Sequence, residues 1–119
     1  MSNDPPRSGA PIGPMSGAGS HYVNSHVAGW REDKPGIWVK PLYEDADRGE
    51  RTLLVRMDPG ARSEPHSHEG FEQVYVLSGS FQDDNRLLRE GDHCCRTPGV
   101  MHSAFSEEGV LVLAIYTRA

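Results

Sequence analysis

Short stretches in which apolar and polar residues alternate follow one another along most of this chain. The stretch RTLLVRM, residues 51–57, places Leu53, Val55 and Met57 on one side of an extended segment. The stretch FEQVYVL, residues 71–77, is rich in β-branched and aromatic residues, which favour strands. No stretch keeps a long period of 3.6 residues, so the pattern predicts strands rather than long helices.

Two further apolar stretches and several turn signals complete this pattern. GIWVKPLYE, residues 36–44, predicts a strand at an edge or a bend, because Pro41 cannot donate a ladder hydrogen bond. GVLVLAIYT, residues 109–117, is apolar on both faces, as expected for a strand covered on both sides. Turns are indicated at DPG (58–60), across Asp83-Asp84-Asn85 in a hairpin of residues 79–88, and at REGD (89–92). Many short strands with regular turns predict an all-β sandwich or barrel.

The first twenty residues differ from the rest in composition. They are rich in Gly, Pro and Ser and carry almost no large apolar side chains. Such a segment cannot bury enough surface to offset the entropy of ordering it. We therefore expect residues 1–20 to be a disordered tail and residues 21–119 to be one β-barrel domain, which suits a chain of 119 residues.

Charge and hydropathy exclude several classes of partner. The net charge is −5 and no block of Lys and Arg occurs, which argues against nucleic acid or an anionic membrane surface. No apolar run approaches the ~18 residues of a membrane span, and the start of the chain lacks the apolar core of a secretory signal. The expectation is a cytoplasmic protein whose partner is a small molecule.

The two cysteines of the chain, Cys94 and Cys95, are neighbours. Adjacent cysteines can form only a strained ring, so they cannot cross-link distant parts of the chain. We interpret them as reduced, partly buried thiols, with a redox or ligand role as the alternative.

Two histidines and a glutamate gather around the start of the strand predicted at residues 71–77. In EPHSHEGFEQVYVLSG, residues 64–79, His66 and His68 are separated by one residue and Glu72 follows four residues after His68. If the segment stays extended, these three side chains share one face. Imidazole nitrogens and a carboxylate oxygen are ligands that suit several divalent metals.

The opposite face of the same segment is apolar. Phe71, Tyr75 and Leu77 alternate with the candidate ligands, so something must cover them: another sheet, the N-terminal segment or a second subunit. A barrel of this size has few spare elements. We therefore expect a homodimer about a twofold axis, with Tyr75 and Leu77 in its interface.

Glycines and a second block of residues frame the candidate ligands. The first block reads Gly60-x5-His66-x-His68-x3-Glu72-x6-Gly79, and the second contains Gly91, Pro98-Gly99 and His102. Together these blocks resemble the two signature motifs of the cupin superfamily. The resemblance covers roughly residues 28–117, and the chain is similar to the small cupin domains of ChrR-type anti-sigma factors and to acetylacetone-cleaving dioxygenases.

The resemblance implies a cupin-type antiparallel jelly-roll β-barrel that holds one divalent metal ion. By position the implied ligands are His66, His68, Glu72 and His102, and the expected metal is Fe(II) or Zn(II), with Mn or Ni as alternatives. Three nitrogens and one oxygen leave one or two positions open on the ion, which is typical of a catalytic site. The Pro-x-Gly usual in the second motif is shortened here to Pro98-Gly99.

Two functions follow from this resemblance. The first is a cupin oxygenase or related enzyme that acts on a small oxygen-chelating substrate such as a diketone or hydroxyketone. Glu72 is then the catalytic group, and it either binds the metal or acts as a base. The second is a metal-binding sensor or regulatory module of the ChrR type without catalysis. Because only a short tail precedes the expected barrel, the enzyme is the first expectation.

The remaining polar candidates are weaker. Arg56 and Arg96 could contact an anionic substrate, with surface salt bridges as the alternative. His21 and His26 are expected to be solvated. His93 is an alternative ligand, because in an extended strand it shares a face with Cys95 and could point inward.

Overall fold

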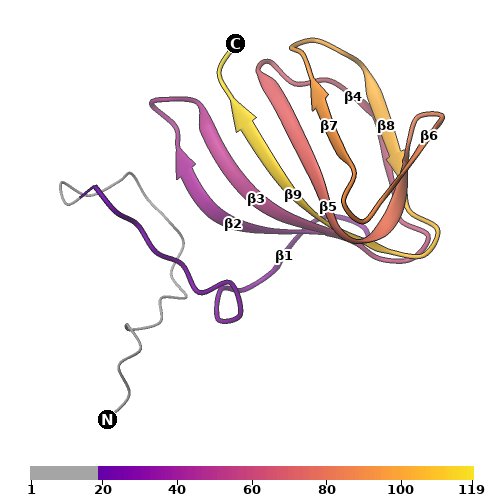
Figure 1. Cartoon of the computed structure of the whole chain (residues 1–119), viewed down its shortest axis with the longest axis horizontal. Helices are drawn as coiled ribbons and strands as arrows, with labels where there is room; N and C mark the ends of the chain where they lie inside the picture. The colour runs from indigo at the N-terminus through magenta and orange to yellow at the C-terminus, as the bar shows by residue number, and fades with distance from the viewer. Residues whose placement is uncertain (1–18) are drawn as a thin grey trace.

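A computed structural model describes residues 19–119, which form nine strands and no helix (Figure 1). The strands are β1 (Arg31–Lys34), β2 (Ile37–Asp45), β3 (Glu50–Met57), β4 (Arg62–His66), β5 (Phe71–Asp83), β6 (Arg86–Arg89), β7 (His93–Arg96), β8 (His102–Phe105) and β9 (Val110–Thr117). The all-β prediction is confirmed. The disordered tail expected at residues 1–20 falls mostly on residues 1–18, which lie outside the described residues.

The strands form one curled antiparallel sheet in the order β1-β2-β3-β9-β5-β8-β4, and β6 and β7 also pair with β5. The first part of β5 pairs with β7 and β9, and its last part pairs with β6 and β8. This long strand therefore connects the part of the barrel that contains β7 and β9 with the part that contains β6 and β8 (Figure 1). No helix in the described part of the chain is long and apolar enough to cross a membrane.

The apolar strands lie where the alternation of residues predicts them. On β3, Leu53 and Met57 are buried, and on β5, Val74 and Val76 are buried while Tyr75 is exposed. Met57, Val74 and Val76 form one core with residues of β9 and β6. The hairpin predicted around Asp84 is also confirmed, because β5 ends at Asp83 and β6 begins at Arg86, with Asp84 at a φ of 53°.

One assumption about the metal-ligand segment is wrong. Residues 66–72 do not form a single extended strand, because β4 ends at His66, a bend occupies residues 69–70, and β5 begins at Phe71. Gly70 permits this bend, since a Cβ atom there would overlap the carbonyl oxygen of Thr117 at the end of β9. His68 therefore reaches the barrel interior from a loop, not from strand alternation.

The outer face of β5 carries the apolar side chains that led us to expect a dimer. Phe71, Tyr75 and Leu77 are exposed, with 36%, 43% and 37% of their surface accessible. They lie on the side of the strand opposite the buried Glu72 and Val74. The other described elements leave this face open, and the homodimer stays a prediction.

We predict that the protein sediments as a dimer at micromolar concentration and that Tyr75→Asp makes it monomeric. The substitution would bury a charge without a partner in the interface, which costs several kcal/mol of association free energy. Sedimentation equilibrium measures the change. Leu87→Asp, at an exposed leucine on β6 outside the predicted interface, serves as the control and should stay dimeric. A monomeric wild-type protein would contradict the prediction.

Candidate metal centre

Three histidines converge inside the barrel. His66 is the last residue of β4 and is paired directly with His102, the first residue of β8. His68 comes from the loop that follows β4, and its Nε2 atom lies 3.3 Å from Nε2 of His102. One ring nitrogen from each of the three histidines lies within 4.8 Å of the others. The structure thus brings together the three histidines that the motifs singled out.

Hydrogen bonding fixes the proton on His66. Its Nδ1 atom lies 2.7 Å from the backbone oxygen of Glu64. A carbonyl oxygen can only accept, so Nδ1 donates this hydrogen bond and Nε2 is the ring nitrogen left for the site. This arrangement, in which one ring nitrogen donates to the protein and the other faces the site, is typical of histidines that bind metal.

The other two histidines are held in the uncharged form. Burial lowers the pKa of His68, and it lowers the pKa of His102 with help from the positive charge of Arg96. Neutral imidazole is the form that binds a metal, so these shifts favour coordination. The buried Nδ1 atom of His102 has no hydrogen-bond partner among the described residues, and Asp83 lies 3.7 Å away.

Glu72 lies beside this cluster as an ionised carboxylate. Its side chain is buried, with Oε2 3.2 Å from Nε2 of His68 and Oε1 3.7 Å from Nε2 of His102. Burial alone would raise the pKa of Glu72, but the hydroxyl of Tyr116 and the hydrogen bond from Arg96 outweigh it and lower the pKa. The three imidazoles, with ring nitrogens within 4.8 Å of one another, form a group that could hold a divalent metal ion, and the Glu72 carboxylate lies beside it.

Arg96 forms ion pairs with two buried carboxylates, those of Glu72 and Asp83. Its Nε atom lies 3.2 Å from Oε1 of Glu72, and its Nη2 atom lies 3.1 and 3.0 Å from the two oxygens of Asp83. Burial would lower the pKa of Arg96, but the hydrogen bonds to Asp83 and Glu72 raise it. Arg96 lines the cavity described below, yet its guanidinium is committed to these two partners.

Arg56, the second predicted substrate contact, lies on the other side of the sheet. Its guanidinium stacks 4.8 Å over the ring of Trp30 and 5.3 Å over that of Trp38, and its Nε atom is 3.8 Å from a carboxylate oxygen of Asp58. Arg56 does not line the cavity, whereas Arg51 on the same strand does. The alternation of faces along β3 could have predicted this difference. Arg51 lies two residues from the buried Leu53 and shares its face, whereas Arg56 lies on the opposite face.

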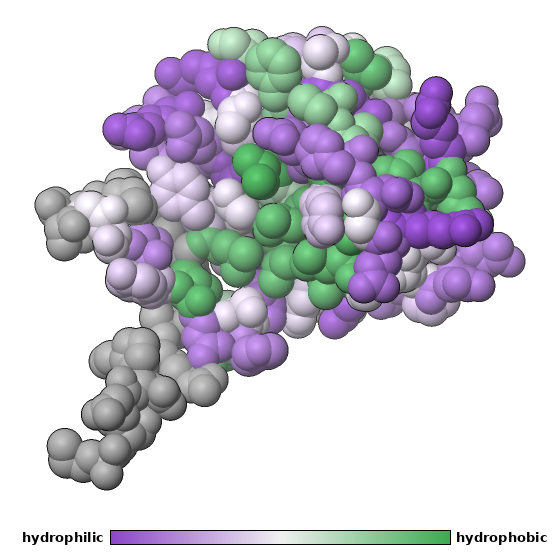
Figure 2. Space-filling model, viewed as in Figure 1, coloured by the Kyte–Doolittle hydropathy of each residue, from purple (hydrophilic) through white to green (hydrophobic). Residues whose placement is uncertain are grey.

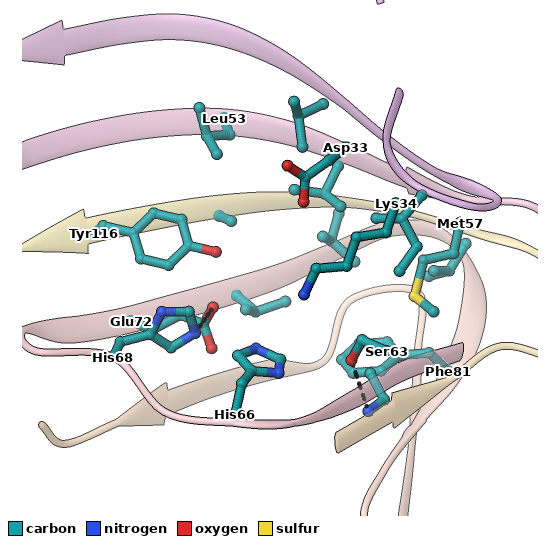
Figure 3. Close-up of a pocket in the computed structure, with 18 of the residues that line it drawn as sticks. Asp33, Lys34, Leu53, Met57, Ser63, His66, His68, Glu72, Phe81 and Tyr116 are labelled. Atoms are coloured by element: carbon teal, nitrogen blue, oxygen red, sulfur yellow. Dashed lines mark hydrogen bonds and ion pairs between the residues drawn. The ribbon is translucent and has the colours of Figure 1, made fainter. Parts of the chain in front are cut away.

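A cavity of about 250 Å³ lies directly over the histidines (Figure 3). Its wall combines apolar with charged and histidine side chains, and Figure 3 shows the His66, His68, Glu72 and Tyr116 side chains directed into the same space. In Figure 2, apolar residues gather at the centre of the viewed face and hydrophilic residues surround them. The apolar wall includes Ile37, Val39, Leu53, Met57, Val74 and Phe81.

The other candidate ligands lie away from this cavity. His93 is exposed and its Nε2 atom is 3.1 Å from Oε1 of Gln73. Both cysteines are free thiols, Cys95 exposed and Cys94 partly buried, with Sγ of Cys94 3.6 Å from an oxygen of Asp83. Burial raises the pKa of Cys94, so this sulfur is a poor nucleophile. The motifs did not indicate Tyr116 or Asp83, which reach the site from β9 and from the end of β5.

Solved structures share this architecture. KdgF from Halomonas sp. is 29% identical over 85% of this chain and 96% of that chain, with a TM-score of 0.70. An acetylacetone dioxygenase from Acinetobacter johnsonii is 12% identical over 87% of this chain and 78% of that chain, with a TM-score of 0.76. The complex of Rhodobacter sphaeroides SigE with the anti-sigma ChrR matches at 24% identity and a TM-score of 0.66, over 73% of this chain but 48% of that one.

The curled antiparallel barrel with inward histidines therefore has the cupin fold. The family model described as ChrR Cupin-like domain matches residues 18–118, and the chain belongs to this family. A search of curated proteins gave no match. The fold is thus established, and its neighbours include enzymes as well as a ChrR regulator.

We predict that the purified protein carries about one divalent metal ion per chain and that His66→Ala or His102→Ala removes it. Each substitution deletes one of three converging nitrogens, and the remaining donors cannot hold the ion tightly. Metal content measured by mass spectrometry on protein purified without chelators tests this. His93→Ala, at an exposed histidine outside the cavity, is the control and should keep the metal. Equal metal content in all variants would contradict the assignment.

We also predict that Arg96→Met lowers the free energy of unfolding by about 3–5 kcal/mol, because it leaves two buried carboxylates without their partner. Urea unfolding followed by circular dichroism measures the loss. Arg48→Met is the matched control: Arg48 pairs with Asp45 from a side chain that is 73% exposed, and such a pair contributes less than about 1 kcal/mol. Equal stabilities of the two variants would show that the Arg96 pairs do not stabilise the fold.

Proposed function

We propose that this protein is a metal-dependent cupin enzyme that acts on a small oxygen-chelating molecule such as a diketone or hydroxyketone. In this proposal His66, His68, His102 and Glu72 hold one divalent metal ion. The observation that carries the proposal is the position of the three converging histidine nitrogens in the wall of a cavity of about 250 Å³. A site that only held a metal would have no need of a space for a second molecule.

The chain's own residues would prepare this cavity for chemistry. Tyr116 and Arg96 keep Glu72 ionised, so it can serve as the fourth ligand or accept a proton from the bound molecule. The apolar side chains in the wall would contact the carbon skeleton of the bound molecule. A bound metal would supply Lewis-acid chemistry, and a redox-active metal such as Fe(II) would add reactivity toward O2.

The second candidate function is that of a metal-binding sensor or regulatory module. It is favoured by membership of the ChrR cupin-like domain family and by the likeness to the SigE–ChrR complex. A sensor would use the same histidines for metal binding but would not turn over a substrate.

We predict that the Fe(II)-loaded protein consumes O2 in the presence of a β-diketone and that Glu72→Gln slows this reaction by about 10²–10⁴-fold, because the variant loses a base at the site. An oxygen electrode and product analysis on a panel of diketones and hydroxyketones make the measurement. His93→Ala should keep the wild-type rate. A protein that binds metal normally but turns over no compound of the panel, with Fe, Mn, Ni or Zn, would favour the sensor.

A further inference from the structure

The charges that line the cavity are unbalanced. The chain as a whole has a net charge of −5. Apart from the histidines, however, the cavity wall includes four cationic side chains and only two carboxylates. The cations are Arg31, Lys34, Arg51 and Arg96, and the carboxylates are Asp33 and Glu72.

Pairing inside the barrel does not remove this excess. Arg96 and Glu72 neutralise each other at 3.2 Å. Arg31, Lys34 and Arg51 line the cavity from solvent-exposed positions and form no ion pair with a carboxylate of residues 19–119, so three cations accompany the single, likewise exposed, carboxylate of Asp33. Cationic groups that line a cavity and have no protein partner are available to a ligand.

An irregularity in β1 turns Lys34 into the cavity. Glu32 is paired with Trp38, but the next pair joins Lys34 to Ile37, so Asp33 is an extra residue in the strand. A bulge of this kind breaks the alternation of faces, and the consecutive residues Asp33 and Lys34 both line the cavity. Figure 3 shows the side chain of Lys34 extended from β1 with its ammonium group directed toward the histidines.

Arg51 adds a second positive charge at the cavity wall. It is paired with Tyr116 across β3 and β9, and its guanidinium lies 4.9 Å from the centre of the Tyr116 ring. Tyr116 is in turn paired with Glu72 across β9 and β5, which places Arg51 in the same part of the molecule as the candidate metal ligands.

We propose that the cavity selects an anionic molecule, a small oxygen chelator that carries a carboxylate group, and that Lys34 binds this carboxylate while Arg51 adds positive potential. The proposal rests on the proposed function, because it names the class of substrate for the same site. It assigns the anion contact to Lys34 and Arg51 instead of Arg56, which lies outside the cavity, and Arg96, which is already paired. Ammonium–carboxylate hydrogen bonds are among the strong ones, and a surplus of one charge along a cavity attracts the opposite charge.

Two probes that differ by one group test this proposal. Acetylacetone is a neutral diketone, and 2,4-dioxopentanoate is the same molecule with one methyl group replaced by a carboxylate. Calorimetric titration of the metal-loaded protein gives the ratio of their dissociation constants. We expect Lys34→Met to reduce the preference for 2,4-dioxopentanoate by about tenfold, Arg51→Gln to reduce it less, and Lys34→Arg to restore most of it.

The matched control is Arg56→Gln, which removes a cation from the same strand as Arg51 but from the opposite face of the sheet. It should leave the ratio unchanged, and a loss there equal to that of Lys34→Met would overturn the assignment. An unchanged ratio in Lys34→Met would also overturn it, while normal binding of both diketones would leave the proposed function intact.

A titration of metal-free protein with malonate, followed by NMR, separates the two proposals. We expect malonate to bind the wild type about tenfold more tightly than Lys34→Met. If neither diketone binds the metal-loaded protein but malonate shows this difference, the proposed function fails and the anion site stands. If malonate shows no difference and neither diketone binds, both proposals are overturned.

Discussion

The buried contact of Arg96 with two carboxylates from the same strand is the constraint on which the barrel and its site depend. Glu72 and Asp83 lie near opposite ends of β5, and a straight strand would separate them by roughly 36 Å at about 3.3 Å per residue. The guanidinium of Arg96 nevertheless contacts both carboxylates. These contacts require β5 to curl around the cavity, and that curl lets the strand pair with β9 at one end and β8 at the other.

The same three charges connect the fold to the chemistry of the site. Removing charged groups from water is costly, and a well-packed apolar substitute for a buried ion pair is often at least as stable. Stability alone therefore does not explain this arrangement. Its further effect is electrostatic: Arg96 helps to keep Glu72 ionised and His102 neutral, which are the protonation states that metal binding needs.

The sequence predicted the strands in which the pattern of apolar residues matches the side chains that are buried in the structure. β2, β3, β5 and β9 carry alternating or continuous apolar residues, whereas β1, β4, β7 and β8 are short and largely polar and left no such signal. The motif spacing indicated the histidines correctly as neighbours, although the bend at Gly70 replaced the extended strand that we assumed. The position of Lys34 was not predictable, because it depends on a bulge that only the pairing of β1 with β2 reveals.

The cavity also distinguishes the two candidate functions, because an enzyme needs space for a substrate and a metal sensor does not. A regulatory metal site needs ligands whose geometry changes when the metal is lost or modified, and three histidines with a carboxylate are sufficient for that. Space beside the ligands, an apolar wall and cations without protein partners serve a molecule that enters from outside. A site that holds only a metal gains nothing from the empty space, which loses packing contacts. This combination is the reason to favour an enzyme over a sensor.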